Sequence, residues 1–302
     1  MAMKSSVVSC CLIGVALLAG GCRRVTDLGP VAQRSESQAI REALGAGSAA
    51  EAESAGGEED LGEGWGTLQG SITFDGGPPA MPAYSVNKDE ATCAPGGSPP
   101  AQEFLHVDPA TQGIANVALY VRDAARVHET AAARTEAVVF DQKVCVFLTH
   151  VMAVSVGQPM MIKNSDDVGH NTNIAGQNAF NQTIPAGESV AFAAKKSEAA
   201  PVPVRCSIHP WMLAYLLPRD DGYVAITKAD GSFELPNLPA GTDVEVQAWH
   251  EHSAGANGAL VVDSPSAQEL RWSKKGRFVV RLEPDQVREV RISVPASAFK
   301  GG

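Results

Sequence analysis

One short segment constrains this chain more than any other: Cys206-Ser207-Ile208-His209-Pro210-Trp211-Met212 spaces a thiol, an imidazole and a thioether three residues apart. A second imidazole, His170, stands 36 residues before Cys206 and is followed by Asn171. A thiolate, two imidazoles and a weak axial thioether together form a donor set for a soft metal ion. Because three donors come from one loop and the fourth from a distant segment, the fold must bring two parts of the chain to one point.

Cys, His, His and a distant Met are the donors of blue-copper electron-transfer centres. Their order and surroundings also resemble those of the cupredoxins, in particular the amicyanin and plastocyanin group. In that group a strand ending in Asn or Asp precedes the first histidine ligand, and Asn follows that histidine. The chain has this arrangement in Ile162-Lys163-Asn164 and His170-Asn171. The resemblance implies one type 1 copper ion, with four ligands: His170, Cys206, His209 and Met212.

The same resemblance implies a Greek-key barrel over about residues 137–217, in which the ligand loop joins the last two strands. It implies that Asn171 ties its own loop to the ligand loop near Ser207. Pro210 lacks a backbone N–H and so leaves one donor fewer near the thiolate. Asn171 and Pro210 can equally be ordinary turn residues. We expect the edge of His209, beside Trp211 and Pro210, to lie at the surface where a redox partner docks.

Residues 1–21 predict export. Lys4 precedes an apolar run from Val7 to Leu18 that is too short to span a bilayer as a lasting helix, as is typical of a signal peptide. The end of this segment, Leu18-Ala19-Gly20-Gly21-Cys22, resembles a bacterial lipobox, although Ala19 stands where Leu is more usual. The resemblance implies that Cys22 is lipidated; a plain signal peptide cut nearby would export the chain without the anchor. We expect an exported cell-envelope lipoprotein, periplasmic or outer-membrane-associated, that contacts the membrane through its lipid.

The six cysteines divide by position. Two lie in the signal peptide, Cys22 would carry lipid and Cys206 would bind copper, which leaves Cys93 and Cys145. In an oxidising exported setting, two remaining cysteines most simply form a disulfide. A second metal site that uses Cys145 and His150, with His106 nearby in the chain, is an alternative, but its spacing fits no standard zinc or iron pattern.

Residues 22–64 predict a flexible acidic linker, because Ala, Gly, Ser and Glu dominate from Arg23 to Gly64 and aromatic residues are absent. Such a linker would hold a folded module away from the membrane. The chain as a whole has a formal net charge of -10. An acidic exported chain argues against nucleic acid as a partner.

The rest of the chain predicts an all-β fold. Apolar and polar residues alternate over residues 67–74 and 117–121, and the turn sequence DGGPP follows at 75–79. Helical periodicity is scarce. Residues 271–300 also alternate and predict a half-buried hairpin that turns at 283–285.

A second resemblance concerns residues 223–233 (YVAITKADGSF) and 235–241 (LPNLPAG). They resemble the second half of a transthyretin-like, carboxypeptidase-regulatory type of small β-sandwich. Such modules open with a strand, a Gly/Pro turn and another strand, which residues 67–79 and 114–121 would supply. The resemblance implies that the cupredoxin barrel is inserted in, or packed on, a small Ig/transthyretin-like β-sandwich. Two modules in series, or N-terminal strands that belong to the barrel, remain open.

We therefore expect five segments along the chain. They are a lipoprotein signal peptide (1–21), a flexible acidic linker (22–64), an N-terminal β segment of the sandwich (65–135), a cupredoxin domain (136–218) and a transthyretin-like, carboxypeptidase-regulatory-like β segment (219–302).

The predicted function is electron transfer by a periplasmic-side, lipid-anchored protein with a single copper ion and a redox partner protein of unknown identity. A copper storage or delivery protein would use the same ligands, and a structural envelope lipoprotein could use copper to staple its fold. Oxidase or nitrite-reductase chemistry needs further open metal positions, whereas the chain has a single His-x-His pair, His250 and His252, and no second ligand set. No Ser/His/Asp pattern or phosphate loop indicates another enzyme class, so we expect no enzymatic activity.

Overall fold

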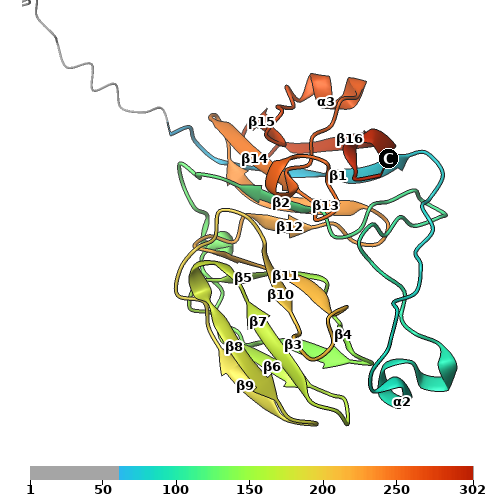
Figure 1. Ribbon diagram of the computed structural model, residues 1–302. Helices are drawn as coiled ribbons and strands as arrows, with labels where there is room; N and C mark the ends of the chain where they lie inside the picture. The colour runs from blue at the N-terminus through green and yellow to red at the C-terminus, as the bar shows by residue number, and fades with distance from the viewer. Residues whose placement is uncertain (1–60, 302) are drawn as a thin grey trace, which may run out of the picture. The chain divides into compact units, whose positions relative to one another are not determined.

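The computed structural model describes residues 61–301 and is built almost entirely of β-strands (Figure 1). This confirms the predicted all-β class. The predicted signal peptide, Cys22 and nearly all of the predicted linker lie outside the described residues. Within residues 61–301, no helix is long and apolar enough to cross a membrane. The helical segments are α2 (Glu90–Cys93), α3 (Pro265–Glu269), η1 (Pro95–Gly97), η2 (Glu129–Ala131), η3 (Gly176–Asn178), η4 (Ala256–Gly258) and η5 (Ala296–Ala298).

Two sheets take their strands from both ends of the described chain. The strands are β1 (Trp65–Asp75), β2 (Ala118–Val121), β12 (Val224–Ile226), β13 (Ser232–Pro239), β14 (Asp243–Trp249), β15 (Arg277–Arg281) and β16 (Val287–Pro295). In one sheet β1 lies between β13, which is antiparallel to it, and β16, which is parallel. The other sheet has the order β12, β2, β14, β15, with every pair antiparallel.

The alternation predicted for residues 67–74 appears in β1, because Leu68, Ile72 and Phe74 are all buried in one apolar core. Burying a side chain of this size contributes about 1.5–3 kcal/mol before the entropy of ordering it is subtracted. Gly70 lies in the middle of β1, where a Cβ would collide with the carbonyl oxygen of Val290 on β16. A glycine at this position therefore lets the two parallel strands approach closely.

The other two sheets use the middle of the chain. Their strands are β3 (Val138–Lys143), β4 (Val146–Phe147), β5 (Val151–Ser155), β6 (Met160–Asn164), β7 (His170–Ile174), β8 (Phe180–Ile184), β9 (Ser189–Phe192), β10 (Val202–Arg205) and β11 (Leu213–Arg219). The larger sheet has the order β5, β11, β10, β7, β8, and the smaller has the order β4, β3, β6, β9. A second core, which includes Phe140, Ile162, Ile174 and Leu216, draws residues from both.

These two sheets do not close into the expected Greek-key barrel. Among the described residues, no hydrogen-bonded ladder joins the smaller sheet to the larger one. The edge strands of the smaller sheet, β4 and β9, have two and four residues. The two sets of strands therefore form open, sandwich-like sheets rather than a closed barrel.

A third apolar cluster contains residues from both sets of sheets: Ala118, Tyr120, Val151, Leu217 and Trp249. The described residues, 61–301, accordingly belong to one compact unit. The predicted boundaries at 135 and 218 fall between strands of the two sets, but a division into separate domains stays a prediction.

The predicted hairpin within residues 271–300 is wrong. β15 pairs with β14, whereas β16 pairs with β1 in the other sheet. Phe278 and Val280 of β15 and Ile292 of β16 nevertheless lie in the same core. The two strands therefore cover that core from different sheets, which a hairpin within one sheet would not allow.

One buried imidazole makes the stability of this fold depend on pH. His250 follows β14 and is 1% exposed, and its Nδ1 accepts a hydrogen bond from the backbone N–H of His252. Burial disfavours the charged ring and nearby His150 adds repulsion, which together lower the pKa of His250 to about 3. The folded protein therefore holds this ring neutral at pH values where the unfolded chain protonates it.

We predict that acid destabilises the protein through His250. The unfolded ring titrates near pH 6.5, so the contribution is present above that pH and is lost as the pH falls toward 3, by about 2 kcal/mol between pH 6.5 and 4.5. Urea unfolding at both pH values measures this loss. His250→Asn keeps an acceptor near the Nδ1 position and should lose clearly less stability on acidification, whereas the neighbouring His252→Asn should behave like the unchanged protein. Equal acid sensitivity of His250→Asn and the unchanged protein would contradict the prediction.

Candidate metal centre

The pairing of β7 with β10 brings the distant histidine to the ligand loop. The two strands are antiparallel, with Val204 opposite Ile174. The C-terminal end of β10, where Cys206 follows, therefore lies beside the N-terminal end of β7, where His170 begins the strand. β11 starts directly after Met212 and returns antiparallel to β10, so the loop is held between two paired strands.

Three of the four predicted ligands meet in the interior. One donor atom from each of His170, Cys206 and His209 lies within 4.8 Å of the other two. The Cys206 Sγ is 4.0 Å from His209 Nδ1, which in turn is 2.9 Å from His170 Nδ1. All three residues are at most 3% exposed. Bonds of about 2 Å from one central ion would set such donors about 3–4 Å apart, so the three side chains fit a metal ion.

Met212 closes the same loop. Its backbone N–H donates to His209 O at 3.0 Å, and its own carbonyl accepts from the Cys206 N–H at 3.4 Å. The side chain is buried and packs in the same apolar cluster as Cys206. The axial role of Met212 stays a prediction.

The environment of Cys206 favours the thiolate, the form that binds metals. The backbone N–H groups of Asn171 and His209 both donate to its Sγ, each at 3.3 Å. Burial raises the pKa of the Cys206 thiol, but the hydrogen bonds from His170 and from these backbone groups outweigh burial and leave the pKa below its ordinary value.

Each histidine is oriented by a carboxylate. The Nε2 of His170 lies 2.7 Å from Asp166 Oδ2, and the Nε2 of His209 lies 2.8 Å from Asp89 Oδ2. An ionised carboxylate only accepts hydrogen bonds, so each Nε2 carries a proton and a neutral ring has its lone pair on Nδ1. The two Nδ1 lone pairs face each other at 2.9 Å. A cation between them, either a proton or a metal ion, removes the repulsion.

The pKa shifts of the two histidines indicate which ring carries the proton between the two Nδ1 atoms when no metal is bound. Burial by itself would lower the pKa of His170, but hydrogen bonds and negative charge from Asp166 and Cys206 outweigh it and raise the pKa to about 9. Burial lowers the pKa of His209, which Asp89 only partly offsets and the charge of His170 reinforces. The extra proton therefore resides on His170, and a metal ion that binds here displaces it.

The two loops that supply the ligands are tied together by Asn171. Its Oδ1 accepts a hydrogen bond from the backbone N–H of Ser207 at 3.3 Å, and its Nδ2 donates to Asn181 Oδ1 at 2.9 Å. This is the contact that the resemblance implies between the Asn171 loop and the ligand loop. Pro210 lies exposed in the same loop.

The expectation that the edge of His209 is exposed is wrong. His209 is 0% exposed because a segment from far upstream covers it. We call this segment, residues 82–102, the strap. Its two ends are joined by backbone hydrogen bonds from Tyr84 N–H to Pro100 O and from Gln102 N–H to Pro82 O, both 2.8 Å. The strap carries α2 and supplies Asp89, the carboxylate that pairs with His209.

The strap is anchored to the rest of the protein at few points. Cys93 forms a disulfide with Cys145, which confirms the predicted pairing, and Cys93 is the only buried residue of the strap. Thr92 Oγ1 donates to Asp167 Oδ1 at 2.5 Å. Val86 packs partly against the core. The disulfide is therefore the main covalent and buried anchor of the segment that covers His209.

Sequence reasoning missed both carboxylates. Asp166 stands four residues before His170, and that short separation was a local signal that could have found it. Asp89 lies 120 residues before His209, and no sequence pattern links the two. The disulfide between Cys93 and Cys145 helps to hold the strap beside the ligand loop, where this contact forms.

The alternative metal sites do not form as proposed. Cys145 is used in the disulfide, and His150 pairs through Nε2 with the carboxylate of Glu251. Within residues 61–301, neither His150 nor the pair His250 and His252 belongs to a group of three metal-donor side chains.

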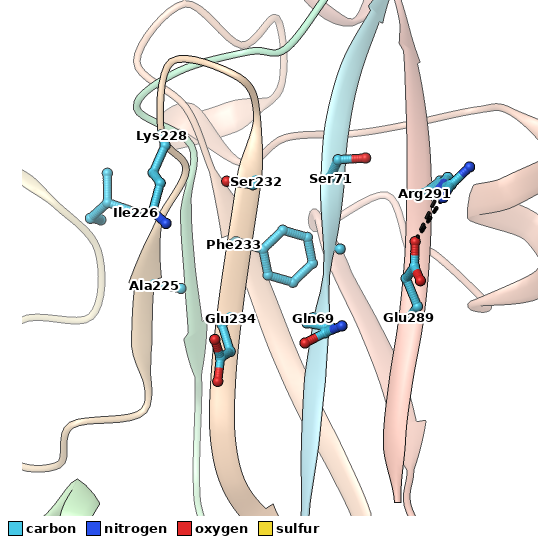
Figure 2. Close-up of a pocket in the computed structure, with 11 residues that line it drawn as sticks. Gln69, Ser71, Ala225, Ile226, Lys228, Ser232, Phe233, Glu234, Glu289 and Arg291 are labelled. Carbon is cyan, nitrogen blue, oxygen red and sulfur yellow. Dashed lines mark hydrogen bonds and ion pairs between the residues drawn. The ribbon is translucent and has the colours of Figure 1, made fainter. Parts of the chain in front are cut away.

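A cavity of about 750 Å³ lies away from the donor group, over β1, β13 and β16 (Figure 2). Its polar side chains include Gln69 on β1, Glu234 on β13 and the paired Glu289 and Arg291 on β16. These groups are spread over three strands rather than gathered at one point, and we assign no role to the cavity.

No family model matches the chain, and no curated protein matches it. Among solved structures, amicyanin from Paracoccus versutus is 17% identical over 33% of this chain and 97% of its own, with a TM-score of 0.25. A purple cupredoxin from Nitrosopumilus maritimus is 18% identical over 28% of this chain and 99% of its own, with a TM-score of 0.24. A Cu-containing nitrite reductase from Thermus scotoductus is 20% identical over 27% of this chain, with a TM-score of 0.25; the match spans 22% of the reductase. These likenesses are weak, and the proposals below do not rest on them.

We predict that Asn171→Ala weakens the connection between the two ligand loops. The change removes the acceptor for the partly buried Ser207 N–H and the amide that donates to Asn181, and a typical hydrogen bond contributes about 0.5–1.5 kcal/mol. Urea unfolding of the metal-free protein measures the loss. Asn173→Ala, an exposed position on the same strand, is the matched control and should change stability by less than about 0.5 kcal/mol. If Asn171→Ala and Asn173→Ala changed the free energy of unfolding equally, the contact between the two ligand loops would not contribute to stability and the prediction would be wrong.

Proposed function

We propose that this protein binds one copper ion through His170, Cys206 and His209, with Met212 as a weak axial ligand, and that it transfers electrons to or from a partner protein. One observation carries the proposal: a buried cysteine poised as a thiolate and two imidazole Nδ1 lone pairs converge on a single point. One thiolate and two imidazoles are the trigonal set of electron-transfer copper sites.

Electron transfer is supported by how firmly the donors are held. Two backbone N–H groups fix the Cys206 sulfur, and Asp166 and Asp89 fix the two rings. Copper(I) and copper(II) prefer different geometries, so a site that holds its ligands in one arrangement lets the electron leave with little rearrangement. Carboxylate partners of this kind also raise the basicity of the ligating rings. We propose a carrier rather than an enzyme, since the donor group is closed and buried.

The first test is spectroscopic. The mature chain is loaded with copper(II), and its visible and electron paramagnetic resonance spectra are recorded beside those of Cys206→Ala. We expect an intense thiolate-to-copper band and narrow hyperfine splitting that vanish in the variant. Ser207→Ala, an exposed change in the same loop, is the control and should keep both signals. A colourless protein, or a band that survives in Cys206→Ala, would refute the copper-thiolate site.

A second function, copper storage or delivery, is favoured by the closure of the site. A carrier usually presents a ligand edge to its partner, whereas here His209 is fully buried and its Nε2 pairs with Asp89. Metal exchange distinguishes the two. Slow loss of copper to a chelator together with fast, reversible reduction supports the carrier, and ready transfer of copper to an acceptor supports storage or delivery.

We further propose that the protein is exported and anchored in the cell envelope through a lipid on Cys22, so that its redox partner lies on the periplasmic side and is not a nucleic acid. The sequence Leu18-Ala19-Gly20-Gly21-Cys22 supports this. Incorporation of a labelled fatty acid by the unchanged protein, but not by Cys22→Ser, is the result expected; equal labelling of both would exclude the anchor.

A further inference from the structure

The disulfide lies directly beside the donor group. A ring nitrogen of His209 and the sulfurs of Cys93 and Cys145 all lie within 4.8 Å of one another, and all three residues are buried. While the disulfide is intact, neither sulfur is a thiolate, so neither can act as a metal ligand. Reduction would turn both sulfurs into thiols, which can bind a metal ion as thiolates.

We propose that reduction of the Cys93–Cys145 disulfide opens a second metal site, in which the two thiolates and His209 bind one copper(I) ion. Two thiolates and an imidazole are soft donors that select copper(I). The site goes beyond the copper centre proposed above and does not depend on it, because Cys206, His170 and Met212 take no part. The two sites share only His209.

The chemistry balances with a dithiol as the reductant. The dithiol gives two electrons and two protons to the disulfide, forms its own cyclic disulfide, and leaves Cys93 and Cys145 as thiols. Copper(I) then displaces the two thiol protons and forms two sulfur–metal bonds. Because copper(I) binds only the reduced cysteines, it shifts the thiol–disulfide equilibrium toward the reduced form and opposes reoxidation of the pair.

The two sulfurs are carried by parts of the protein that differ in how firmly they are held. Cys145 is fixed, since its N–H donates to Asp166 Oδ2 at 2.9 Å and its carbonyl accepts from Trp211 Nε1 at 3.0 Å. Cys93 lies on the strap, whose other residues are exposed or partly exposed. A dithiol can therefore reach the disulfide when the strap is displaced. After reduction the strap can return to a position in which the two sulfurs lie about 4 Å apart. Two bonds of about 2.3 Å to one ion require this separation.

Binding at the second site must disturb the first. In the oxidised protein, His209 uses Nδ1 toward His170 and Cys206, and Nε2 toward Asp89. A copper(I) ion that takes a ring nitrogen of His209 displaces one of these partners. The state of the disulfide thus decides whether His209 serves only the first donor group or also the second site.

The test uses the mature Cys206→Ala chain, which removes the thiolate of the first centre. The protein is reduced with dithiothreitol, freed of reductant without oxygen, and titrated with copper(I) in competition with a chromophoric copper(I) chelator. We expect about one equivalent of copper(I) to bind the reduced chain and none to bind the oxidised chain. X-ray absorption should show sulfur ligands at about 2.3 Å. The same chain with Cys93→Ser should lose the uptake, whereas Ser98→Ala, an exposed strap residue, should keep it.

Uptake that is equal in the oxidised and reduced chains, or that survives Cys93→Ser, would overturn the proposal, and so would binding of zinc(II) without copper(I). If Cys206→Ala fails to fold by circular dichroism, the unchanged chain is used: the reduced form should bind one copper(I) more than the oxidised form, and an equal number overturns the site. The outcome is separate from that of the proposed function, because the thiolate-to-copper band is measured on the oxidised protein, in which the second site is closed.

Discussion

The carboxylate of Asp166 holds together the parts on which the metal centre depends. It accepts hydrogen bonds from the backbone N–H groups of Val144 and Cys145, at 2.7 and 2.9 Å, and it pairs with His170 Nε2 at 2.7 Å. One side chain thereby joins the turn after β3, the disulfide and the first histidine. The negative charge is almost fully buried, and a buried charge destabilises a fold unless it is paired and hydrogen-bonded. Loss of any of these contacts would therefore be strongly destabilising. The orientation of the histidine and the anchoring of the strap are consequences of the same buried charge.

Local patterns were enough to predict the elements of this protein, and long-range packing decided how they combine. The alternation in β1 and the three-residue spacing of Cys206, His209 and Met212 are properties of short stretches, so they can be read from the chain. The disulfide followed from elimination of the other cysteines. The barrel and the C-terminal hairpin were wrong because the pairing of strands depends on long-range packing and on which core each strand covers. Asp89 was missed because a separation of 120 residues leaves no local pattern.

The burial of the donor group favours one requirement of the proposed function, a fixed donor geometry, and opposes another, the close approach of a partner protein. Burial and fixed hydrogen bonds keep the donors in one geometry, which favours rapid electron transfer. Electron exchange also needs a close approach of the partner, and the strap occupies the place beside His209 where that approach would occur. The strap is held by one disulfide and a few polar contacts rather than by a large apolar area. It can therefore protect the centre and still be displaced without unfolding the sheets.

The position of β1 has a consequence for the order in which the chain can assemble. Both of its neighbours, β13 and β16, follow the entire middle set of strands, and Gly70 meets Val290 across a separation of 220 residues. The strands of the two middle sheets, β3 to β11, pair only among themselves and can form first. Until the last strands emerge, β1 has unpaired backbone groups on both sides, and contacts of such long range form slowly. A chain of this design must therefore be kept from aggregating until its C-terminal strands have been made.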